Sequence, residues 1–529
     1  MLDKNNTRDK NSTNNILINW HDFKLKIIIE GMIVGFFTGL LIVFYRYLLD
    51  IALTFTKHMY LLQLKNHWLI PIWFSVLIAG GWIVGTISKK DPMVSGSGIP
   101  QAEGVLSGKL SMTWWRVVLG KFVGGVISIG AGLSLGREGP SVQMGAAIGQ
   151  GFSRIFKRFK LEENFLITSG ASAGLSAAFN APFAGVIFAL EEIHKNFSPT
   201  IMTSALAASL TADFVSKEFF SMKPMFDFKQ ITAIPLNNYA YIIVLGIILG
   251  LLGVVFNKGI FKSQDIYAKL KFIPAQFKPV IAFLIAGLLG LFMPEVLGGG
   301  ETIISSLVTT PLSLKVLLVI LVVKFLFTMV SYGSSAPGGI FLPLVVVGAL
   351  IGVIYGNIMH GVFGFNLIYI PNLVILGMAG YFAAIVKAPI TGCILITEMT
   401  GSFSHLLSVG LVCLIAYMVV DVLNSKPIYE VLLERFLLKG TNKFKGKKDT
   451  KVIMETSIFM GSKLDGKMVK EMKWPTGCLV VAIKRGETEI IPTGATKIMA
   501  GDYLVVLSNE DNASLIKESL SKAGEYLTS

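Results

Sequence analysis

Long apolar stretches dominate the chain and predict membrane-spanning helices. From Phe325 to Val386, 62 consecutive positions contain no Asp, Glu, Lys or Arg. Because about 20 apolar residues suffice to cross a bilayer, this stretch holds at least two segments at membrane depth. Further apolar segments begin near Gly31, His67, Trp114, Thr200, Tyr239, Pro279, Val316 and Ser404. The pattern predicts an all-α polytopic membrane protein.

Both ends of the chain depart from this pattern. The first 15 residues are polar and lack the apolar core and cleavage site of a signal peptide, so we expect 1–24 to be a flexible cytoplasmic tail. A lysine-rich linker at 439–451 follows the expected membrane domain, 25–438. Basic flanks mark cytoplasmic loops. We therefore expect both termini in the cytoplasm, and the protein in the cytoplasmic membrane.

Composition and charge agree with a membrane protein. Only 15% of the residues are charged, against about 25% in soluble domains. The net charge of +14 lies outside 452–529, where nine Lys/Arg stand against ten Asp/Glu. Because the excess gathers at the ends of apolar segments, we expect no nucleic-acid partner. Three scattered cysteines form no metal-ligand pattern, and we expect neither a metal nor a cofactor.

The membrane domain repeats itself. Residues 92–100, PMVSGSGIP, align with 294–302, PEVLGGGET, at an offset of 202. Lys121 pairs with Lys324 at an offset of 203, and APFAGVIFALEE (181–192) aligns with APITGCILITEM (388–399) at 207. We expect repeats over about 25–215 and 235–430. Repeats in membrane proteins are typical of transporters that bind substrate between the halves. With both termini on one side, two halves with an odd number of crossings are inverted.

Glycine and proline interrupt the apolar segments at three motifs, GSGIP (96–100), GREGP (136–140) and GGIFLP (338–343). Proline breaks the helical hydrogen-bond ladder, so helices begin or end there. Non-helical backbone at membrane depth survives where it is buried or lines a polar cavity. Helix N-termini present unpaired N–H groups, which attract anions. The motifs predict an anion site.

These motifs, in their order and spacing, resemble the CLC family of chloride channels and proton-coupled chloride antiporters. The resemblance extends through FNAPFAGVIFALEE, KAPITGCILITEMT and KPIYEVL and covers roughly residues 25–438. It implies a homodimer with one pore per subunit. Each subunit would consist of two inverted repeats of short tilted helices, the CLC fold, and would carry chloride and protons.

The resemblance also implies roles for individual residues. The hydroxyls of Ser97 and Tyr429 and the backbone N–H groups of Ile340 and Phe341 would bind the central anion. Glu138 would be the external gating glutamate. The remaining motif residues expected at the anion site are Gly98, Ile99, Gly136, Arg137 and Gly139. Arg137 would add positive potential or anchor its helix.

Carboxylates at membrane depth are nearly confined to Glu138, Glu191, Glu192 and Glu398, and ionisable residues there are functional by default. An ionised Glu138 would occupy the anion's position and leave it when protonated, which links anion entry to proton uptake. Glu191 aligns with Glu398 across the repeat, which favours a structural role. Glu192 aligns with Met399, and it matches the family's internal proton acceptor, which is apolar in many channels.

Simpler explanations remain for each site residue. GREGP suits glycine-mediated helix packing with a structural Arg–Glu pair, Ser97 could satisfy a nearby carbonyl, and Tyr429 could belong to an aromatic belt. The preferred function is chloride/proton exchange, and the alternative is a ligand-gated passive chloride channel. Potassium transport lacks the TVGYG filter. The absence of hydrolase and phosphate-loop motifs argues against an enzyme.

Residues 452–529 predict a small cytoplasmic α+β domain. We expect a hairpin over 478–492 with its turn at 485–487, a strand over 502–511, and helices over 464–472 and 512–524. The segment, through this pattern and GATKIMAGDYLVVL (494–507), resembles the TrkA-C/RCK module of potassium transport proteins. Such modules dimerise and bind small regulatory ligands, so we expect a dimerisation cap or a site for a nucleotide or cyclic dinucleotide.

Overall fold

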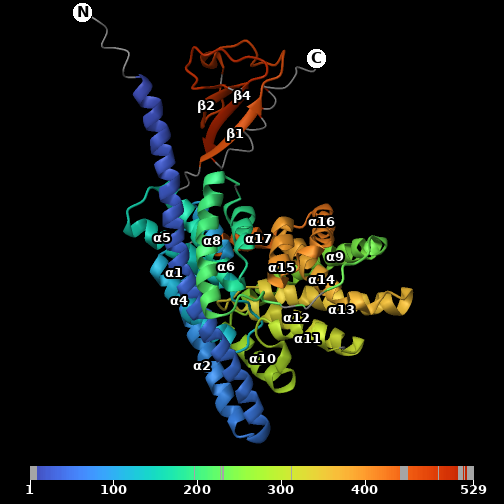
Figure 1. Cartoon of the computed structure of the whole chain (residues 1–529). Helices are drawn as coiled ribbons and strands as arrows, with labels where there is room; N and C mark the ends of the chain where they lie inside the picture. The colour runs from blue at the N-terminus through green and yellow to red at the C-terminus, as the bar shows by residue number, and fades with distance from the viewer. Residues whose placement is uncertain are drawn as a thin grey trace, which may run out of the picture. The chain divides into compact units, whose positions relative to one another are not determined.

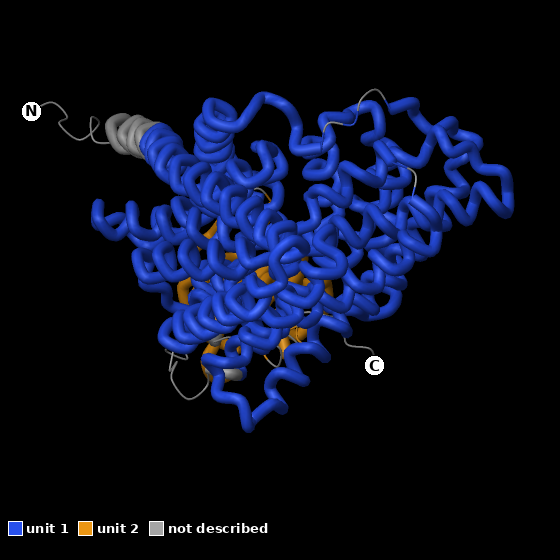
Figure 2. Tube along the Cα trace, turned by 90° about the horizontal axis from the view of Figure 1, so that it is seen from below, with its two compact units in different colours: residues 1–439 blue, residues 440–529 orange. Residues whose placement is uncertain are grey.

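The computed structural model describes residues 9–440 apart from Asn196, Asp227, Lys229, Gln230 and Pro311, residues 451–509 apart from Lys473 and Glu487, and Ile516, Ser519, Leu520 and Ala523. The chain divides into two compact units, residues 1–439 and 440–529 (Figure 2). Each unit is described by itself.

The first unit is built of helices joined by loops (Figure 1). Its first half contains α1 (Asp9–Lys65), α2 (Leu69–Lys90), η1 (Pro92–Val94), α3 (Ile99–Leu106), α4 (Trp114–Gly130), α5 (Glu138–Ile155), α6 (Lys160–Phe179), α7 (Pro182–Phe188), the π-helical η2 (Ala189–His194) and α8 (Pro199–Phe219). Its second half contains η3 (Leu236–Asn238), α9 (Tyr239–Lys269), η4 (Ala275–Phe277), α10 (Lys278–Phe292), η5 (Pro294–Val296), α11 (Glu301–Thr309), α12 (Leu314–Gly333), α13 (Phe341–Phe363), η6 (Leu367–Tyr369), α14 (Ile370–Val386), α15 (Pro389–Thr400), η7 (Phe403–His405), α16 (Leu406–Val422) and α17 (Ile428–Gly440).

The order of elements repeats, as the sequence predicts. Helices α1–α8 correspond in order to α9–α16, and a short 3-10 turn precedes both α3 and α11. Gly96 and Gly98, before α3, have φ values of 62° and 99°; Gly298 and Gly300, before α11, have 64° and 93°. Since a Cβ strains this left-handed backbone, glycine is required at equivalent places in both halves.

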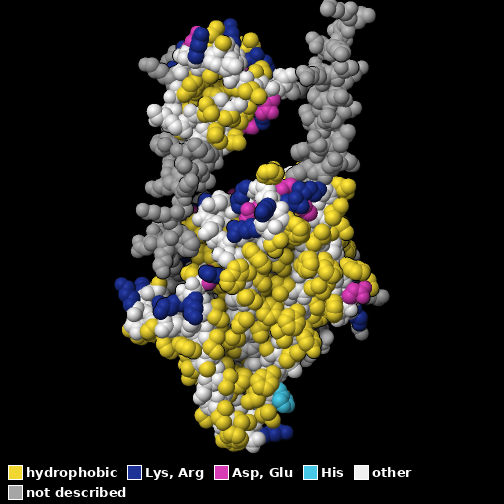
Figure 3. Space-filling view, turned by 90° about the vertical axis from the view of Figure 1, so that its left-hand side faces the viewer, with side chains coloured by type: hydrophobic (Ala, Val, Ile, Leu, Met, Phe, Trp, Pro, Cys, Tyr) yellow, Lys and Arg dark blue, Asp and Glu magenta, His cyan; other side chains and the backbone are white. Residues whose placement is uncertain are grey.

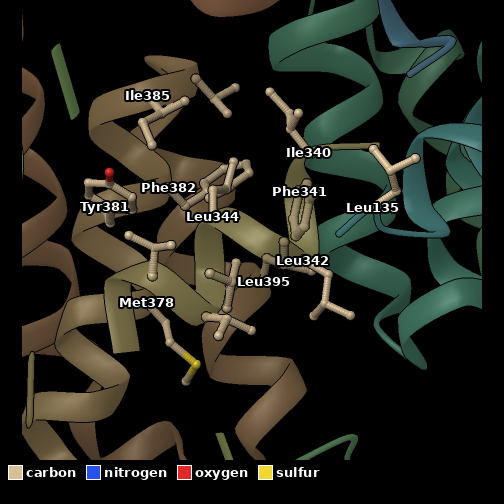
Figure 4. Packing of buried hydrophobic residues seen from close by; sticks show 14 of the residues in the cluster. Leu135, Ile340, Phe341, Leu342, Leu344, Met378, Tyr381, Phe382, Ile385 and Leu395 are labelled. Carbon is tan, nitrogen blue, oxygen red and sulfur yellow. The ribbon is translucent and has the colours of Figure 1, made fainter. Parts of the chain in front are cut away.

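Eight helical segments among the described residues are long and apolar enough to cross a membrane. Large apolar side chains remain exposed on their outer faces, such as Phe44 on α1 and Trp82 on α2, and they cover much of the surface of this unit (Figure 3). Helix α13 is different, because 89% of its apolar window is buried inside the protein. A helix that is apolar on every side belongs in a core, and the start of α13 packs among buried residues of other helices, such as Phe382 on α14 (Figure 4).

Two helix breaks lie at equivalent places in the two halves. Helix α6 ends at Phe179, Asn180 adopts a left-handed φ of 56°, and α7 starts at Pro182. Likewise, Lys387 has a φ of 63° between α14 and α15. Proline suits the first turn of a helix because its missing N–H has no helical partner there. Both breaks start a new helix, whose first N–H groups need partners from outside that helix.

The second unit contains a four-stranded antiparallel sheet in the order β1-β4-β2-β3. The strands are β1 (Lys451–Ser457), β2 (Cys478–Arg485), β3 (Thr488–Ile490) and β4 (Tyr503–Asn509). The hairpin and the third predicted strand are confirmed, whereas β1 is an additional strand. Buried Ile483, Leu504 and Val506 form its core with Ile516 and Leu520.

The predicted helix over 464–472 is wrong. Only Val469–Glu471 form a 3-10 turn, η8, and Met468 forms an isolated bridge with Lys497. Gly466 adopts a φ of 79°, which ends any helix before it lengthens. The predicted helix over 512–524 lies largely outside the described residues; Ile516, Ser519, Leu520 and Ala523 within it are helical.

Candidate functional site

The three glycine-rich motifs meet at the centre of the first unit. Gly136 and Gly339 exchange both backbone hydrogen bonds, each 2.7 Å long. Gly338 N–H donates to the Gly96 carbonyl at 3.0 Å, which joins the loop before α3 to the same point. The N-terminal ends of α3, α5 and α13 are thereby held together. Since helix N-termini carry unpaired N–H groups, the arrangement favours a bound anion.

Two buried lysines hold the loops in place. Lys121 Nζ donates to the carbonyls of Val94 and Gly96, at 2.9 and 2.7 Å. Lys324 Nζ donates to Val296 and Gly298, at 2.9 and 2.6 Å. Both lysines are fully buried, where a charge needs such partners. The repeat pairs them in the sequence, but only the structure shows what they bind.

Buried polar atoms at the motifs lack protein partners. Ser97 Oγ, Tyr429 OH and both carboxylate oxygens of Glu138 are buried without a hydrogen bond among the described residues. Most buried polar atoms in proteins are paired. Free hydroxyl donors are what an anion requires, so the orphaned hydroxyls of Ser97 and Tyr429 fit the role expected of them. The aromatic belt is a poor description of Tyr429, which is fully buried.

The predicted glycines act by lacking a side chain. A Cβ at Gly136 would lie 2.1 Å from Glu138 Oε2, and a Cβ at Gly139 would lie 2.4 Å from Ser97 Oγ. A Cβ at Gly98, which caps α3 ahead of Ile99, would lie 2.4 Å from Gln143 Oε1. These glycines therefore make room for the Glu138 carboxylate and place the Ser97 hydroxyl against the start of α5.

Ile340 and Phe341 begin α13, with Ile340 as its N-cap. Their N–H groups belong to the first turn, where no helical carbonyl accepts them. The buried Phe341 ring packs against Phe382, at a centroid distance of 4.7 Å (Figure 4). It also packs against Phe179, at a centroid distance of 5.0 Å. This packing holds the start of α13 against α6 and α14.

Arg137 and Glu138 face different partners. Arg137 pairs with Glu301 at 3.2 Å and with Asp50 at 3.8 Å, so it ties the start of α5 to α11 and α1. The Glu138 side chain is fully buried. The N–H groups of Glu138 and Leu342 face its carboxylate without reaching hydrogen-bond geometry. The arrangement fits the anchoring role expected of Arg137 better than a structural pair between Arg137 and Glu138.

Glu191 and Glu398 cap helices of the opposite half. Glu398 accepts the N–H groups of Phe183 and Ala184 at 3.2 and 2.8 Å. Glu191 accepts the Thr391 N–H at 2.8 Å and its hydroxyl at 2.7 Å. Each carboxylate thus satisfies the first turn of the other half's helix, which agrees with the structural role expected from their alignment.

Glu192 is placed differently from Glu191. It lies in the π-helical η2, is 5% exposed, and its Oε1 has no hydrogen bond among the described residues. π-Helical turns recur at functional sites. The side chain lies within electrostatic range of Tyr429, so the structure brings it to the same region as the candidate anion site.

Tyr332 is a site residue that the sequence analysis missed. It lies on α12, is 4% exposed, and a Cβ at Gly96 would be 3.6 Å from its hydroxyl. Its hydroxyl thus borders the loop that carries Ser97. No motif marks it, because it stands in an apolar helix.

Within the described ranges, no group of three or more His, Cys, Asp or Glu could hold a metal ion.

Comparison with known proteins identifies two families. The voltage-gated chloride channel family matches residues 78–421, and the TrkA-C domain matches residues 453–521. The H(+)/Cl(-) exchange transporter ClcA of Yersinia pestis bv. Antiqua (strain Angola) is 34% identical over 441 residues, 80% of this chain and 90% of the relative. That of Salmonella arizonae is 33% identical over 432 residues, 78% of this chain and 89% of the relative. These relatives are transporters.

Solved structures show the same fold. A slow cyanobacterial Cl−/H+ antiporter matches with a TM-score of 0.75 and 31% identity, over 78% of this chain and 99% of the other. A CLC-type fluoride/proton antiporter matches with a TM-score of 0.63 and 24% identity, over 74% and 95%, which supports the fold alone. Together with the eight apolar helices, these findings show that the chain is a multi-pass membrane protein that belongs to the CLC family and ends in a TrkA-C domain.

Proposed function

We propose that the protein exchanges chloride for protons across the cytoplasmic membrane. The observation that carries the proposal is the buried Glu138 carboxylate, which lies where the N-termini of α5 and α13 meet. A carboxylate and a halide are attracted to the same N–H groups, so they compete for this position. The relatives named as H(+)/Cl(-) exchange transporters and the similar cyanobacterial antiporter support it.

Proton binding to Glu138 would open the anion route. The ionised carboxylate is held by the positive ends of the helices. Protonation removes the charge, and the side chain gives up its place to chloride. The hydroxyls of Ser97 and Tyr429 and the N–H groups of Ile340 and Phe341 then bind the anion. Glu192, buried on η2, accepts the proton on the cytoplasmic side, apart from the chloride path.

A second copy of the chain is part of the proposal. Polar groups at membrane depth must be covered by protein or water. The Glu398 bond to Phe183 N–H and the Glu191 bond to Ile390 N–H lie at the surface of the unit. The neighbouring Phe183 and Ile390 side chains are exposed. A homodimer that packs α7 and α15 against a partner would cover both bonds.

Both termini would lie in the cytoplasm. The domain at residues 452–529 would bind a nucleotide or cyclic dinucleotide, or would only dimerise.

The test is proton movement driven by chloride. Purified protein in liposomes with a chloride gradient is expected to move protons against their own gradient, as reported by a pH-sensitive dye. We expect Glu138→Gln and Glu192→Gln each to abolish this movement, because neither amide can carry a proton. Glu218→Gln is the control, since Glu218 is exposed on α8.

The passive chloride channel is the alternative outcome. A channel would show a reversal potential that follows the chloride gradient alone and does not change with pH. That result in the unmodified protein would contradict the proposal. Proton coupling that persists in both the Glu138→Gln and the Glu192→Gln variants would remove these residues from the mechanism.

A further inference from the structure

Lys195 and Glu103 form an ion pair at the end of η2. Lys195 Nζ donates to Glu103 Oε1 at 2.7 Å. The Lys195 backbone is left-handed, with φ 55° and ψ 33°, a conformation that non-glycine residues seldom adopt. The lysine side chain is 44% exposed, whereas that of Glu103 is 9% exposed. The lysine therefore turns back from the exposed helix end toward a buried carboxylate.

This ion pair lies next to Glu192. The charged groups that act most strongly on Glu192 are Lys195, Glu103, Glu191 and Glu430, one cation among three other carboxylates. The Glu191 carboxylate already accepts the Thr391 N–H in the first turn of α15. Glu103 Oε2 and Glu192 Oε1 have no hydrogen bond among the described residues. Lys195 is thus the cation available to an ionised Glu192.

Among the described residues, Lys195 is the one cation in the set of groups that act most strongly on Glu192. Helix α3 contributes Glu103, α17 contributes Glu430, and α6 contributes Thr168, which hydrogen-bonds His194 Nδ1 at 2.8 Å. Helix α7 has no titratable residue in its sequence, PFAGVIF. Lys109 acts on Glu103. The local balance of charge therefore depends on Lys195.

Helix α3 connects this ion pair to the anion site. Its first residue, Ile99, follows Ser97 and Gly98, and Glu103 stands one turn later. Four residues of α-helix span about 6 Å. A Cβ at Gly104 would lie 2.5 Å from Leu110 and 2.9 Å from Leu433 on α17, so α3 is tightly packed. One short, fixed helix carries both the Ser97 loop and Glu103.

We propose that Lys195, held by Glu103, is a positioning residue that lets Glu192 release its proton to the cytoplasm, an inference that rests on the proposed exchange. The proton leaves the Glu192 carboxyl for water at the exposed end of η2. The Lys195 ammonium stabilises the carboxylate that remains, since an ion in a low-dielectric interior needs a partner. Glu103 fixes the ammonium and offsets part of its charge.

The two partners predict opposite effects on the pH dependence of proton transport. Removing the cation with Lys195→Met makes ionised Glu192 less stable, so the midpoint of proton flux rises by about one pH unit. Removing the competing carboxylate with Glu103→Gln leaves more of the ammonium's charge for Glu192, so the midpoint falls by a similar amount. Damage to the structure alone would lower the flux without separating the midpoints in this way.

The experiment measures proton and chloride flux of the full chain in liposomes, with the pH varied equally on both sides. Lys195→Arg keeps the charge and is expected to keep the midpoint of the unmodified protein. Lys157→Met is the matched control. Lys157 also has a left-handed backbone, with φ 51°, and it is exposed at the end of α5. The Lys157→Met substitution therefore removes the same charge at a position remote from Glu192.

Opposite shifts in Lys195→Met and Glu103→Gln, with none in Lys157→Met, support the inference. Because Lys195 is nearly half exposed, its substitution leaves the core intact. A midpoint that fails to rise in Lys195→Met therefore overturns the inference even if Glu103→Gln does not fold. If the unmodified protein moves chloride without protons, the proposed function and the inference both fall. If it couples the two ions and the midpoints do not move, only the inference falls.

Discussion

The positions of the functional atoms at the site depend on neighbouring glycines, which have no side chain. Glu138 and Ser97 are confined by Gly136 and Gly139, whose missing side chains leave the carboxylate and the hydroxyl their positions. Because protein interiors are packed at crystal density, one methyl group at either position displaces a functional atom. The site is therefore defined as much by its glycines as by its polar side chains.

Gly139→Ala is expected to weaken chloride binding. The new methyl group would lie 2.4 Å from Ser97 Oγ, a contact that forces the hydroxyl away from the start of α5. The loss of one hydrogen bond to an anion amounts to about 1.5 kcal/mol or more, roughly tenfold in affinity. Isothermal titration of the purified full chain with chloride measures the change. Gly361→Ala is the control, because its added Cβ would meet no atom within 4 Å beyond the neighbouring backbone of its own helix; equal affinities in the two variants would contradict the expectation.

The sequence predicts more about the positions of the site residues than about their partners. Ser97, Glu138, Ile340 and Tyr429 are located by motifs, since helix interruptions at membrane depth are visible as Gly and Pro. The partners of Arg137, by contrast, come from α1 and α11. Pairing between distant segments is set by packing, and no local pattern encodes it. Whether these residues bind chloride is still a prediction.

Helices and strands follow the sequence where their ends are chemically marked. The breaks before α7 and α15 have a proline after a left-handed residue, and they were predictable. The capping of these helices by Glu398 and Glu191 was not, because each cap comes from the other half. In the second unit, β1 starts within a lysine-rich segment that resembles a linker, so strand pairing with β4 overrides the composition.

The sheet of the second unit depends on a buried carboxylate. Asp502 is fully buried, and its oxygens accept Arg485 Nε and Nη2, both at 2.8 Å, and the Met499 N–H at 2.9 Å. Burial alone would raise the pKa of Asp502, but the hydrogen bonds from Arg485 and Met499 outweigh it and hold this pKa below its usual value. A carboxyl whose pKa is lower in the folded state than in the unfolded state stabilises the fold when the pH is above the unfolded-state pKa. This stability is lost as the pH falls through the folded-state pKa.

Asp502→Asn is expected to destabilise the second unit at neutral pH by about 1–3 kcal/mol, because the Arg485 donors lose a charged acceptor. The difference from the unmodified protein should begin to shrink below about pH 4, where the carboxyl of the unfolded chain becomes protonated, and should vanish only below the lower pKa of the folded state. Hydrogen exchange of peptides from 478–509 in the full chain measures it. Glu489→Gln, at an exposed position on β3, is the control, and equal protection in both variants at pH 7 would contradict the expectation.

The whole first unit uses one plan twice for different purposes. Both halves have a buried lysine that binds two carbonyls of a glycine loop. In the first half the loop carries Ser97. In the second half it leads into Glu301, which pairs with Arg137. The repeat is visible in the sequence, but the difference in use is not, because equivalent positions in the two halves have different neighbours.

Lys121→Met and Lys324→Met therefore separate folding from binding. Each removes the donor for two buried carbonyls, so both should lower the stability of the purified full chain by a similar amount, about 1–3 kcal/mol, seen as a lower midpoint of thermal unfolding. Of the two lysines, Lys121 is the one that supports the Ser97 loop, through its bond to the Gly96 carbonyl. Chloride affinity should fall roughly tenfold in Lys121→Met and stay near that of the unmodified protein in Lys324→Met. Equal losses of affinity would show that the loops of both halves contribute to chloride binding.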